Sequence, residues 1–228
     1  MPPFAGHSAD PIPPPVMPVL RLFFILFVLP LLVQPVAAAT LEEMAGQMIL
    51  VGFEGDGPAD AGVKAVVSDL EAGRLGGVMY LKKNVSSLQT VREMNVIFRA
   101  ASPGLPPFIT LDQEGGAVER LTRDVGFAEL PNAETVAANN TPEQAEKIYG
   151  RMAQGIAEQG FSVNFGPVAD LNTNPENQII ARFGRAFSAD PMVVIDYDSA
   201  FVRAHRAAGL VTALKHFPGH GSSHRRQS

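Results

Sequence analysis

The chain has 228 residues, a net charge of −5 and no cysteine, which excludes disulfides and thiol chemistry. Its apolar fraction of 46% is ordinary for a globular protein. The basic residues are scattered along the chain and form no arginine stripe, so the composition argues against a nucleic-acid partner.

The first 39 residues differ in composition from the remainder, and we expect them to be a signal peptide with a proline-rich lead. A basic residue precedes the apolar run 22–33, and the small residues 36–39 follow it, as in a secretory leader. The run is too short to cross ~30 Å of hydrocarbon, so we expect no stable membrane span after cleavage. The true start is either Met1 or Met17. We expect secretion or a periplasmic location, with a membrane tether through an uncleaved leader as the alternative.

Residues 40–228 alternate between extended and helical patterns. A capping box at 40–43 predicts a short first helix. The other expected helices are 58–72, 87–101, 141–160 and 190–209, and the expected strands are 48–53, 76–81, 107–112, 163–171 and 211–217. We expect the first strand to be buried and the stretch between 112 and 141 to be a polar loop. Strict alternation predicts a parallel sheet with right-handed crossovers.

Polar side chains lie at the ends of three of the expected strands. Asp112 ends the third strand, Asp170 lies near the end of the fourth, and Lys215 and His216 end the fifth. This is the pattern of a (β/α)8 barrel, and the glycine fingerprint of an open dinucleotide-binding sheet is absent after the first strand. A complete barrel needs eight strands and about 250 residues. The expected fold class is therefore α/β, an incomplete (β/α)8 TIM-type barrel with about five strands.

Three segments carry candidate ligand-binding chemistry, and each has a structural alternative. The loop 112–116 (DQEGG) offers carboxylates to sugar hydroxyls, although acids beside Gly-Gly are also common in solvated turns. The polar stretch 164–191 follows a strand, where function often lies, or is a loop held by side-chain caps. Lys215 either donates to a polar ligand or extends from the edge of the core.

Three histidines near the C-terminus are spaced i, i+4 and i+8, a spacing that on a helix would suggest metal ligands. Pro218 and the two neighbouring glycines prevent a helix there. We expect no metal and no other cofactor.

Four motifs in this order resemble family 3 glycoside hydrolases, specifically the bacterial β-N-acetylhexosaminidase branch. They are LDQEGGAVERL (111–121), NFGPVADLNTNPENQII (164–180), GRAFSADP (184–191) and KHFPGHG (215–221). The resemblance implies a (β/α)8 barrel that removes terminal N-acetylglucosamine from peptidoglycan fragments with retention at the anomeric carbon. It also implies which residues bind the sugar in the innermost subsite: Asp112, Arg120, Arg185, Lys215 and His216.

The sequence departs from the family after Gly221. The family continues with an Asp-Ser-His loop that supplies the acid/base pair, and its aspartate nucleophile follows a later strand, whereas this chain reads SSHRRQS and ends. A retaining mechanism needs both groups, so we expect no catalytic residue and no hydrolysis from these 228 residues, as in a fragment or a frameshift product. We also expect poor independent folding, because a parallel sheet that does not close leaves an unpaired edge and an uncovered apolar face. A β-glucosidase or a phosphorolytic enzyme on the same scaffold is an alternative, as is a non-catalytic sugar-binding protein.

Overall fold

The computed structural model describes residues 39–102 and 104–223. The described residues from Thr40 onward form one compact unit. The predicted signal peptide lies outside the described residues except for Ala39. Within the described ranges, no helix has the length and apolar character needed to cross a lipid bilayer.

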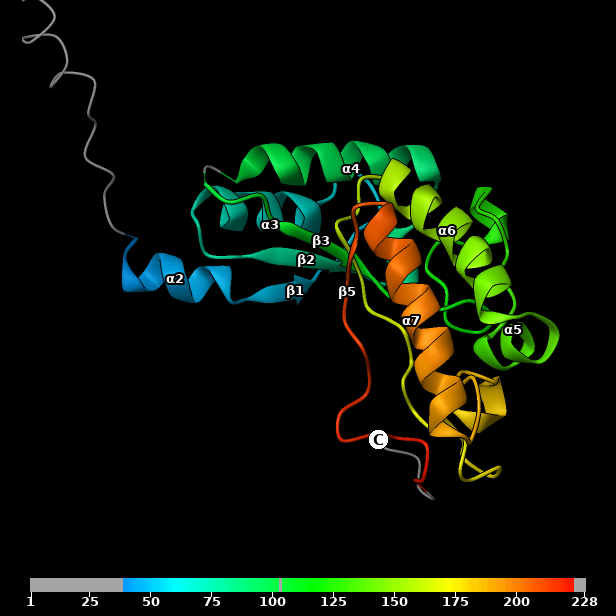
Figure 1. Ribbon diagram of the computed structural model, residues 1–228. Helices are drawn as coiled ribbons and strands as arrows, with labels where there is room; N and C mark the ends of the chain where they lie inside the picture. The colour runs from blue at the N-terminus through cyan, green and yellow to red at the C-terminus, as the bar shows by residue number, and fades with distance from the viewer. Residues whose placement is uncertain (1–38, 103, 224–228) are drawn as a thin grey trace, which may run out of the picture. The chain divides into compact units, whose positions relative to one another are not determined.

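Five parallel strands form one sheet in the order β1-β2-β3-β4-β5 (Figure 1). The strands are β1 (Leu50–Gly52), β2 (Gly77–Tyr80), β3 (Phe108–Leu111), β4 (Val163–Asn164) and β5 (Val211–Thr212). Thr110 of β3 lies opposite Val163, which in turn lies opposite Val211. A sequential order with right-handed crossovers places the connecting helices on one face of the sheet. It also places the carboxyl ends of all five strands at one edge.

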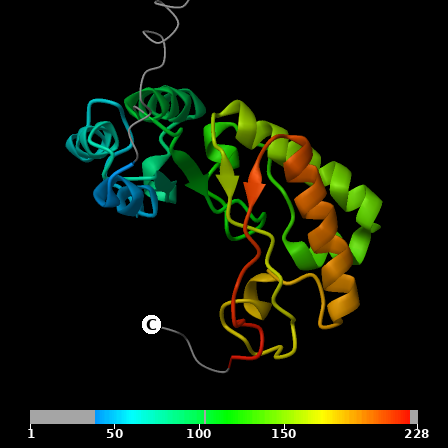
Figure 2. The same ribbon diagram turned by 60° about the vertical axis from the view of Figure 1, so that its left-hand side comes forward.

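One helix precedes the first strand and the others follow or connect the strands, and all of them except α5 are predicted from the sequence. They are α2 (Leu41–Gln47), α3 (Ala61–Glu71), α4 (Leu88–Ala101), α5 (Ala133–Asn139), α6 (Pro142–Glu158) and α7 (Pro191–Ala207), with the short 3-10 turns η2 (Lys82–Asn84), η3 (Arg123–Val125) and η4 (Ala181–Phe183). Helix α6 lies beside α7 (Figure 2). Both predicted capping boxes are present, at Thr40 for α2 and at Thr141 for α6. The predicted alternation of strands and helices is confirmed.

The core lies between the helices and one face of the sheet. Alternate residues of the central strands are completely buried on that face: Val78, Tyr80, Ile109 and Leu111. The opposite face carries exposed apolar side chains, among them Phe108, which is 50% exposed. The helices thus cover one face of the sheet and leave the ends of the strands accessible.

The prediction of a buried strand over 48–53 is wrong. Strand β1 covers only Leu50–Gly52, and Met48 and Ile49 before it are exposed. Within the described sheet β1 pairs with β2 alone, so its apolar side chains have neighbours on one side only. An apolar run in the sequence predicts a strand, but it does not show whether that strand lies inside the sheet or at its edge.

Strands β4 and β5 are much shorter than the predicted 163–171 and 211–217. Beyond Asn164 the chain reaches Pro167, which has no amide hydrogen for a regular ladder. Pairing continues as single contacts, because the Lys215 amide donates to the Pro167 carbonyl at 3.0 Å and the Ala169 amide donates to the Lys215 carbonyl at 2.6 Å. The segments therefore stay together without forming long strands.

The stretch between 112 and 141 is also not simply a polar loop, because it contains α5. Asn132 caps this helix by accepting the Thr135 amide at 2.9 Å. Ala133 and Val136 pack into the core. The helix has seven residues, which is too short for its periodicity to stand out in the sequence.

Candidate functional site

The candidate site begins at Asp112, which directly follows β3. Its Oδ2 accepts a hydrogen bond from Arg120 Nη2 at 2.8 Å, and its Oδ1 accepts one from Lys215 Nζ at 2.7 Å. The three side chains are 13 to 19% exposed. The predicted meeting of the ends of the third and fifth strands is thus present in the structure.

A second carboxylate, Glu114, lies beside the first. Its Oε1 is 2.6 Å from Lys215 Nζ. Arg185 binds it with two parallel hydrogen bonds, Nε to Oε2 at 2.8 Å and Nη2 to Oε1 at 2.9 Å, the fork geometry in which arginine recognises a carboxylate. Burial acts to lower the pKa of Arg185, but the bonds with Glu114 more than offset this, and the net pKa is raised. Lys215 therefore bridges two carboxylates that three cations surround.

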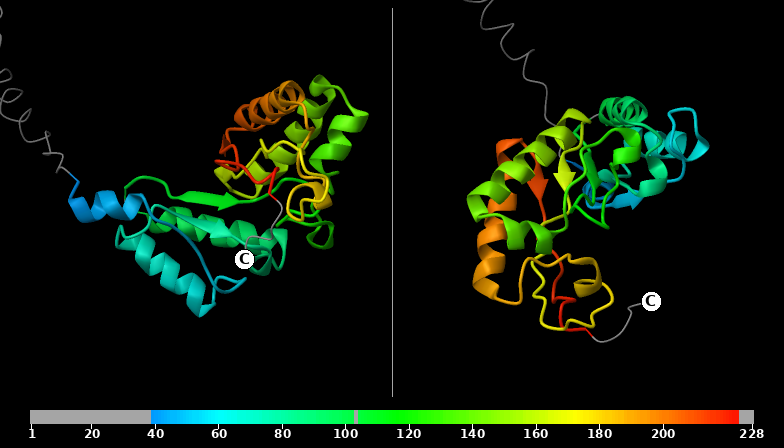
Figure 3. Two further views of the ribbon diagram at one scale, coloured as in Figure 1. Left: turned by 90° about the horizontal axis from the view of Figure 1, so that it is seen from below. Right: turned by 90° about the vertical axis from the view of Figure 1, so that its right-hand side faces the viewer.

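His216 joins the site through Asp170. Its Nδ1 is 2.6 Å from Asp170 Oδ2, and Asp170 Oδ1 accepts from the backbone amides of His220 and Gly221. Burial raises the pKa of Asp170, but these hydrogen bonds outweigh it and the net pKa lies below the usual value. The loop after β5 is therefore held against the loop after β4, and the two lie together beyond the strand ends (Figure 3).

A buried polar network supports the Asp112 loop from behind. Gln113 is completely buried, and its side-chain Oε1 accepts from the backbone amide of Arg120 at 2.9 Å. The backbone amide of Gln113 donates to Asn164 Oδ1 at 2.9 Å. Asn164 Nδ2 then donates to His205 Nε2 at 2.9 Å, and His205 Nδ1 donates to the Phe201 carbonyl at 2.9 Å. These bonds require neutral His205 with its proton on Nδ1. Helix α7 thereby positions the loop that carries Asp112.

The buried His205 predicts a pH dependence of stability. Burial lowers its pKa from 6.5 to about 4, so between these values the unfolded chain binds the proton and the folded chain does not. As the pH falls from 6.5 to 4, the free energy of unfolding of the wild type should decrease by up to about 3 kcal/mol relative to that of His205→Gln. Urea denaturation of both proteins at pH 7, 5.5 and 4.5 measures this difference. A difference in unfolding free energy that stays constant over this range would contradict the assignment.

The predicted sugar-binding residues share one cavity of about 490 Å³. Its walls include all five of them, together with Glu114: Asp112, Arg120, Arg185, Lys215 and His216. Within the described residues, the buried Nε of Arg120 has no hydrogen-bond partner. A larger hollow of about 900 Å³ runs between α6 and α7, away from the strand ends. We take the smaller cavity as the candidate site because the polar side chains converge there.

The predicted sugar-binding residues do not include Glu114 and Asp170, although both lie in polar segments of the sequence. Glu114 follows Asp112 by two residues in the same loop, and Asp170 lies near the end of an expected strand. Those positions were the only available signal. In the part of the chain that the structure describes, no three His, Asp or Glu side chains are grouped to hold a metal ion.

The sequence of residues 40–227 matches the family model described as the glycosyl hydrolase family 3 N terminal domain. The chain belongs to glycosyl hydrolase family 3. A beta-hexosaminidase from Stenotrophomonas maltophilia (strain R551-3) is 38% identical over 159 residues, which cover 67% of this chain and 45% of that relative. The family 3 chain thus spans less than half the length of this curated relative.

Solved structures of family 3 relatives have the same fold. A family 3 beta-N-acetylglucosaminidase from Paenibacillus sp. str. FPU-7 has a TM-score of 0.74 and 28% identity, covering 81% of this chain and 34% of that one. A beta-N-acetylhexosaminidase from Beutenbergia cavernae DSM 12333 has a TM-score of 0.68 and 27% identity, covering 82% of this chain and 56% of that one. The predicted incomplete (β/α)8-type barrel is therefore confirmed.

Proposed function

We propose that this family 3 chain carries the sugar-binding part of a β-N-acetylhexosaminidase-type glycoside hydrolase that acts on terminal N-acetylglucosamine. The observation that carries the proposal is the bridge from Lys215 to both Asp112 and Glu114, at 2.7 and 2.6 Å, in a wall of the cavity. The names of the relatives from Stenotrophomonas and Paenibacillus support the choice of sugar.

The cluster is suited to bind and orient a sugar ring. Asp112 can accept hydrogen bonds from two neighbouring hydroxyls, while Lys215 and Arg120 donate to hydroxyl oxygens, and charge-assisted hydrogen bonds are the strong kind. Cationic side chains already hold both carboxylates, which suits them to accept hydrogen bonds and not to deliver a proton. Hydrogen bonds that strengthen as the ring becomes oxocarbenium-like supply several kcal/mol in such enzymes.

We also propose a natural substrate and a cellular location for this chain. Fragments of peptidoglycan that end in N-acetylglucosamine fit an enzyme with this site outside the cytoplasm. The leader composition of residues 1–39, with a basic residue, an apolar run and small residues, supports secretion or a periplasmic location. Fractionation of cells that express the tagged chain, with N-terminal sequencing of the mature form, tests this location.

Calorimetric titration of the 228-residue chain tests the proposed function. We expect N-acetylglucosamine to bind with a Kd of about 1 mM, which corresponds to a binding free energy of roughly 4 kcal/mol. We expect glucose to bind more weakly. Equal binding of glucose would favour a glucosidase, and absence of heat with either sugar would contradict the proposal. Assay of a chromogenic N-acetyl-β-glucosaminide, with and without phosphate, reports separately on hydrolysis and phosphorolysis.

A further inference from the structure

Asp170 lies next to the sugar cavity without lining it. The cavity of about 490 Å³ is lined by His216 but not by Asp170. Asp170 borders a separate hollow of about 250 Å³, and His216 lines that hollow as well. The imidazole ring of His216 therefore stands between the two spaces, and Asp170 reaches a ligand in the sugar cavity only through the residues that it holds.

The carboxylate of Asp170 is held from two directions. Its side chain has no exposed surface. Oδ1 accepts hydrogen bonds from the backbone amides of His220 and Gly221, and Oδ2 lies 2.6 Å from His216 Nδ1. The pKa of Asp170 lies below its usual value, so the group is an anion that can only accept hydrogen bonds. The proton between the two side chains therefore belongs to His216 Nδ1.

A proton on Nδ1 determines how His216 meets a ligand. In a neutral imidazole the other nitrogen, Nε2, then carries no proton and is an acceptor. Among the described residues, none forms a hydrogen bond with Nε2, and the side chain is 25% exposed. The ring of His220 lies at 4.6 Å between centroids and meets His216 at its edge. Nε2 is therefore open to a hydrogen bond from a ligand.

An acceptor at this position complements the donors around it. Lys215, directly before His216, and Arg120 carry only donors. A sugar hydroxyl that accepts a hydrogen bond from Lys215 Nζ still has its own hydrogen to donate. Leaving that hydrogen without an acceptor inside the cavity would weaken binding. Nε2 of His216 supplies an acceptor in addition to the carboxylate of Asp112.

We propose that Asp170 is a positioning residue for sugar binding: it holds the proton of His216 on Nδ1 and thereby makes Nε2 an acceptor for a hydroxyl of the sugar in the cavity. This inference deepens the proposed function and rests on it, because the cavity must hold a sugar for Nε2 to meet a hydroxyl. The control of the proton by Asp170 is a property of the chain without sugar and can be measured by itself.

Nitrogen NMR of the imidazole at about pH 8 shows which ring nitrogen of His216 carries the proton. We expect the proton on Nδ1 in the wild type and on Nε2 in Asp170→Asn. In the variant, the amides of His220 and Gly221 require the carbonyl of the asparagine, so its NH2 group faces Nδ1 and makes that nitrogen the acceptor. A wild-type proton on Nε2 or on both nitrogens, or an unchanged ring in Asp170→Asn, would overturn the inference.

Titration of N-acetylglucosamine into the same proteins measures the consequence for binding. Asp170→Asn should weaken binding about fivefold, the loss of one hydrogen bond. The same substitution in a His216→Gln background should have no further effect, because glutamine places its amide near the position of Nε2 and has no atom at the position of Nδ1. A fivefold loss that persists in this background would show that Asp170 acts only by holding the loop, and would overturn the inference.

The titration also separates this inference from the proposed function. If the wild type binds no N-acetylglucosamine, the proposed function fails, and the assignment of Nε2 to a sugar hydroxyl fails with it. If the wild type binds the sugar and Asp170→Asn binds it equally well, the proposed function stands and this inference alone is overturned.

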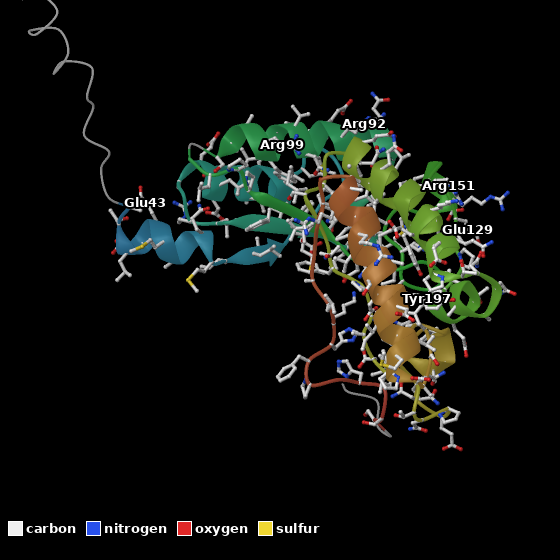
Figure 4. All side chains as sticks on the ribbon, viewed as in Figure 1. Glu43, Arg92, Arg99, Glu129, Arg151 and Tyr197 are labelled. Carbon is white, nitrogen blue, oxygen red and sulfur yellow. The ribbon has the colours of Figure 1, made fainter. Side chains whose placement is uncertain are left out.

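Glu129→Gln is the matched control. It also removes one carboxylate charge, 3.8 Å from Arg123, but the Glu129 side chain is 67% exposed. Glu129 lies beside α6 and away from the loop after β5 (Figure 4), and it lines neither of the two spaces beside His216. The variant should keep the His216 proton on Nδ1 and the sugar affinity of the wild type. An equal loss of affinity in Glu129→Gln and Asp170→Asn would mean that net charge is responsible, and would overturn the inference.

Discussion

Replacing Asp112 by asparagine is expected to weaken N-acetylglucosamine binding by about 30-fold, or roughly 2 kcal/mol. The asparagine keeps the shape of the side chain but replaces one acceptor oxygen with an amide donor that faces Lys215 or Arg120, each of which lies within 2.8 Å of the native carboxylate. The variant therefore loses charge-assisted hydrogen bonds to the sugar and disturbs the two donors beside it. Calorimetric or NMR titration of the sugar measures the change.

Asp69→Asn is the matched control for this experiment. Asp69 also forms an ion pair, with Arg74 at 2.6 Å, but the Asp69 and Arg74 side chains are 41% and 61% exposed and lie outside the cavity that contains Asp112. Sugar affinity should be unchanged in this variant. Comparable loss of affinity in the two variants would mean that the Asp112 effect is a general effect on charge and not a contact with the sugar.

Replacing Glu114 by glutamine is expected to lower the free energy of unfolding by about 3 kcal/mol. Glu114 and Arg185 are 7% and 11% exposed, so removal of the carboxylate leaves the guanidinium buried with no opposite charge at hydrogen-bond distance. Lys215, which lies 2.6 Å from Glu114, loses one of its two negatively charged partners as well. Urea denaturation at pH 7 measures the change as a fall in the midpoint concentration.

Glu146→Gln provides the comparison on the surface of the same unit. Glu146 pairs with Arg203 at 2.8 Å, but both side chains are more than one third exposed. Exposed pairs contribute up to about 1 kcal/mol, so this variant should be nearly as stable as the wild type. Equal destabilisation by the two substitutions would show that burial of the Glu114 pair does not determine its contribution.

The order of the elements followed from the sequence because local signals specify them. The boxes at Thr40 and Thr141 mark helix starts, and alternation of strands and helices dictates a parallel sheet whose strand ends share one edge. That rule alone brings Asp112 and Lys215 together, although 103 residues separate them. The prediction of a shared site is therefore a consequence of topology.

The lengths of β4 and β5 did not follow from the sequence, because strand length depends on pairing with a neighbour as well as on composition. The choice of partners inside the site was also not predictable. Glu114 binds Arg185, which is 71 residues away, and nothing in the spacing distinguishes that arginine from Arg182. Only the three-dimensional structure places Arg185 against the carboxylate and Arg182 in a neighbouring cavity.

A crystal structure of the 228-residue chain with N-acetylglucosamine tests most directly whether the charged side chains at the strand ends bind one sugar ring. We expect the ring in the cavity of about 490 Å³, with its hydroxyls within hydrogen-bond distance of Asp112, Lys215 and Arg120. A sugar bound elsewhere, such as in the hollow between α6 and α7, or a structure with Asp112 and Lys215 at opposite ends of the strands, would contradict this account.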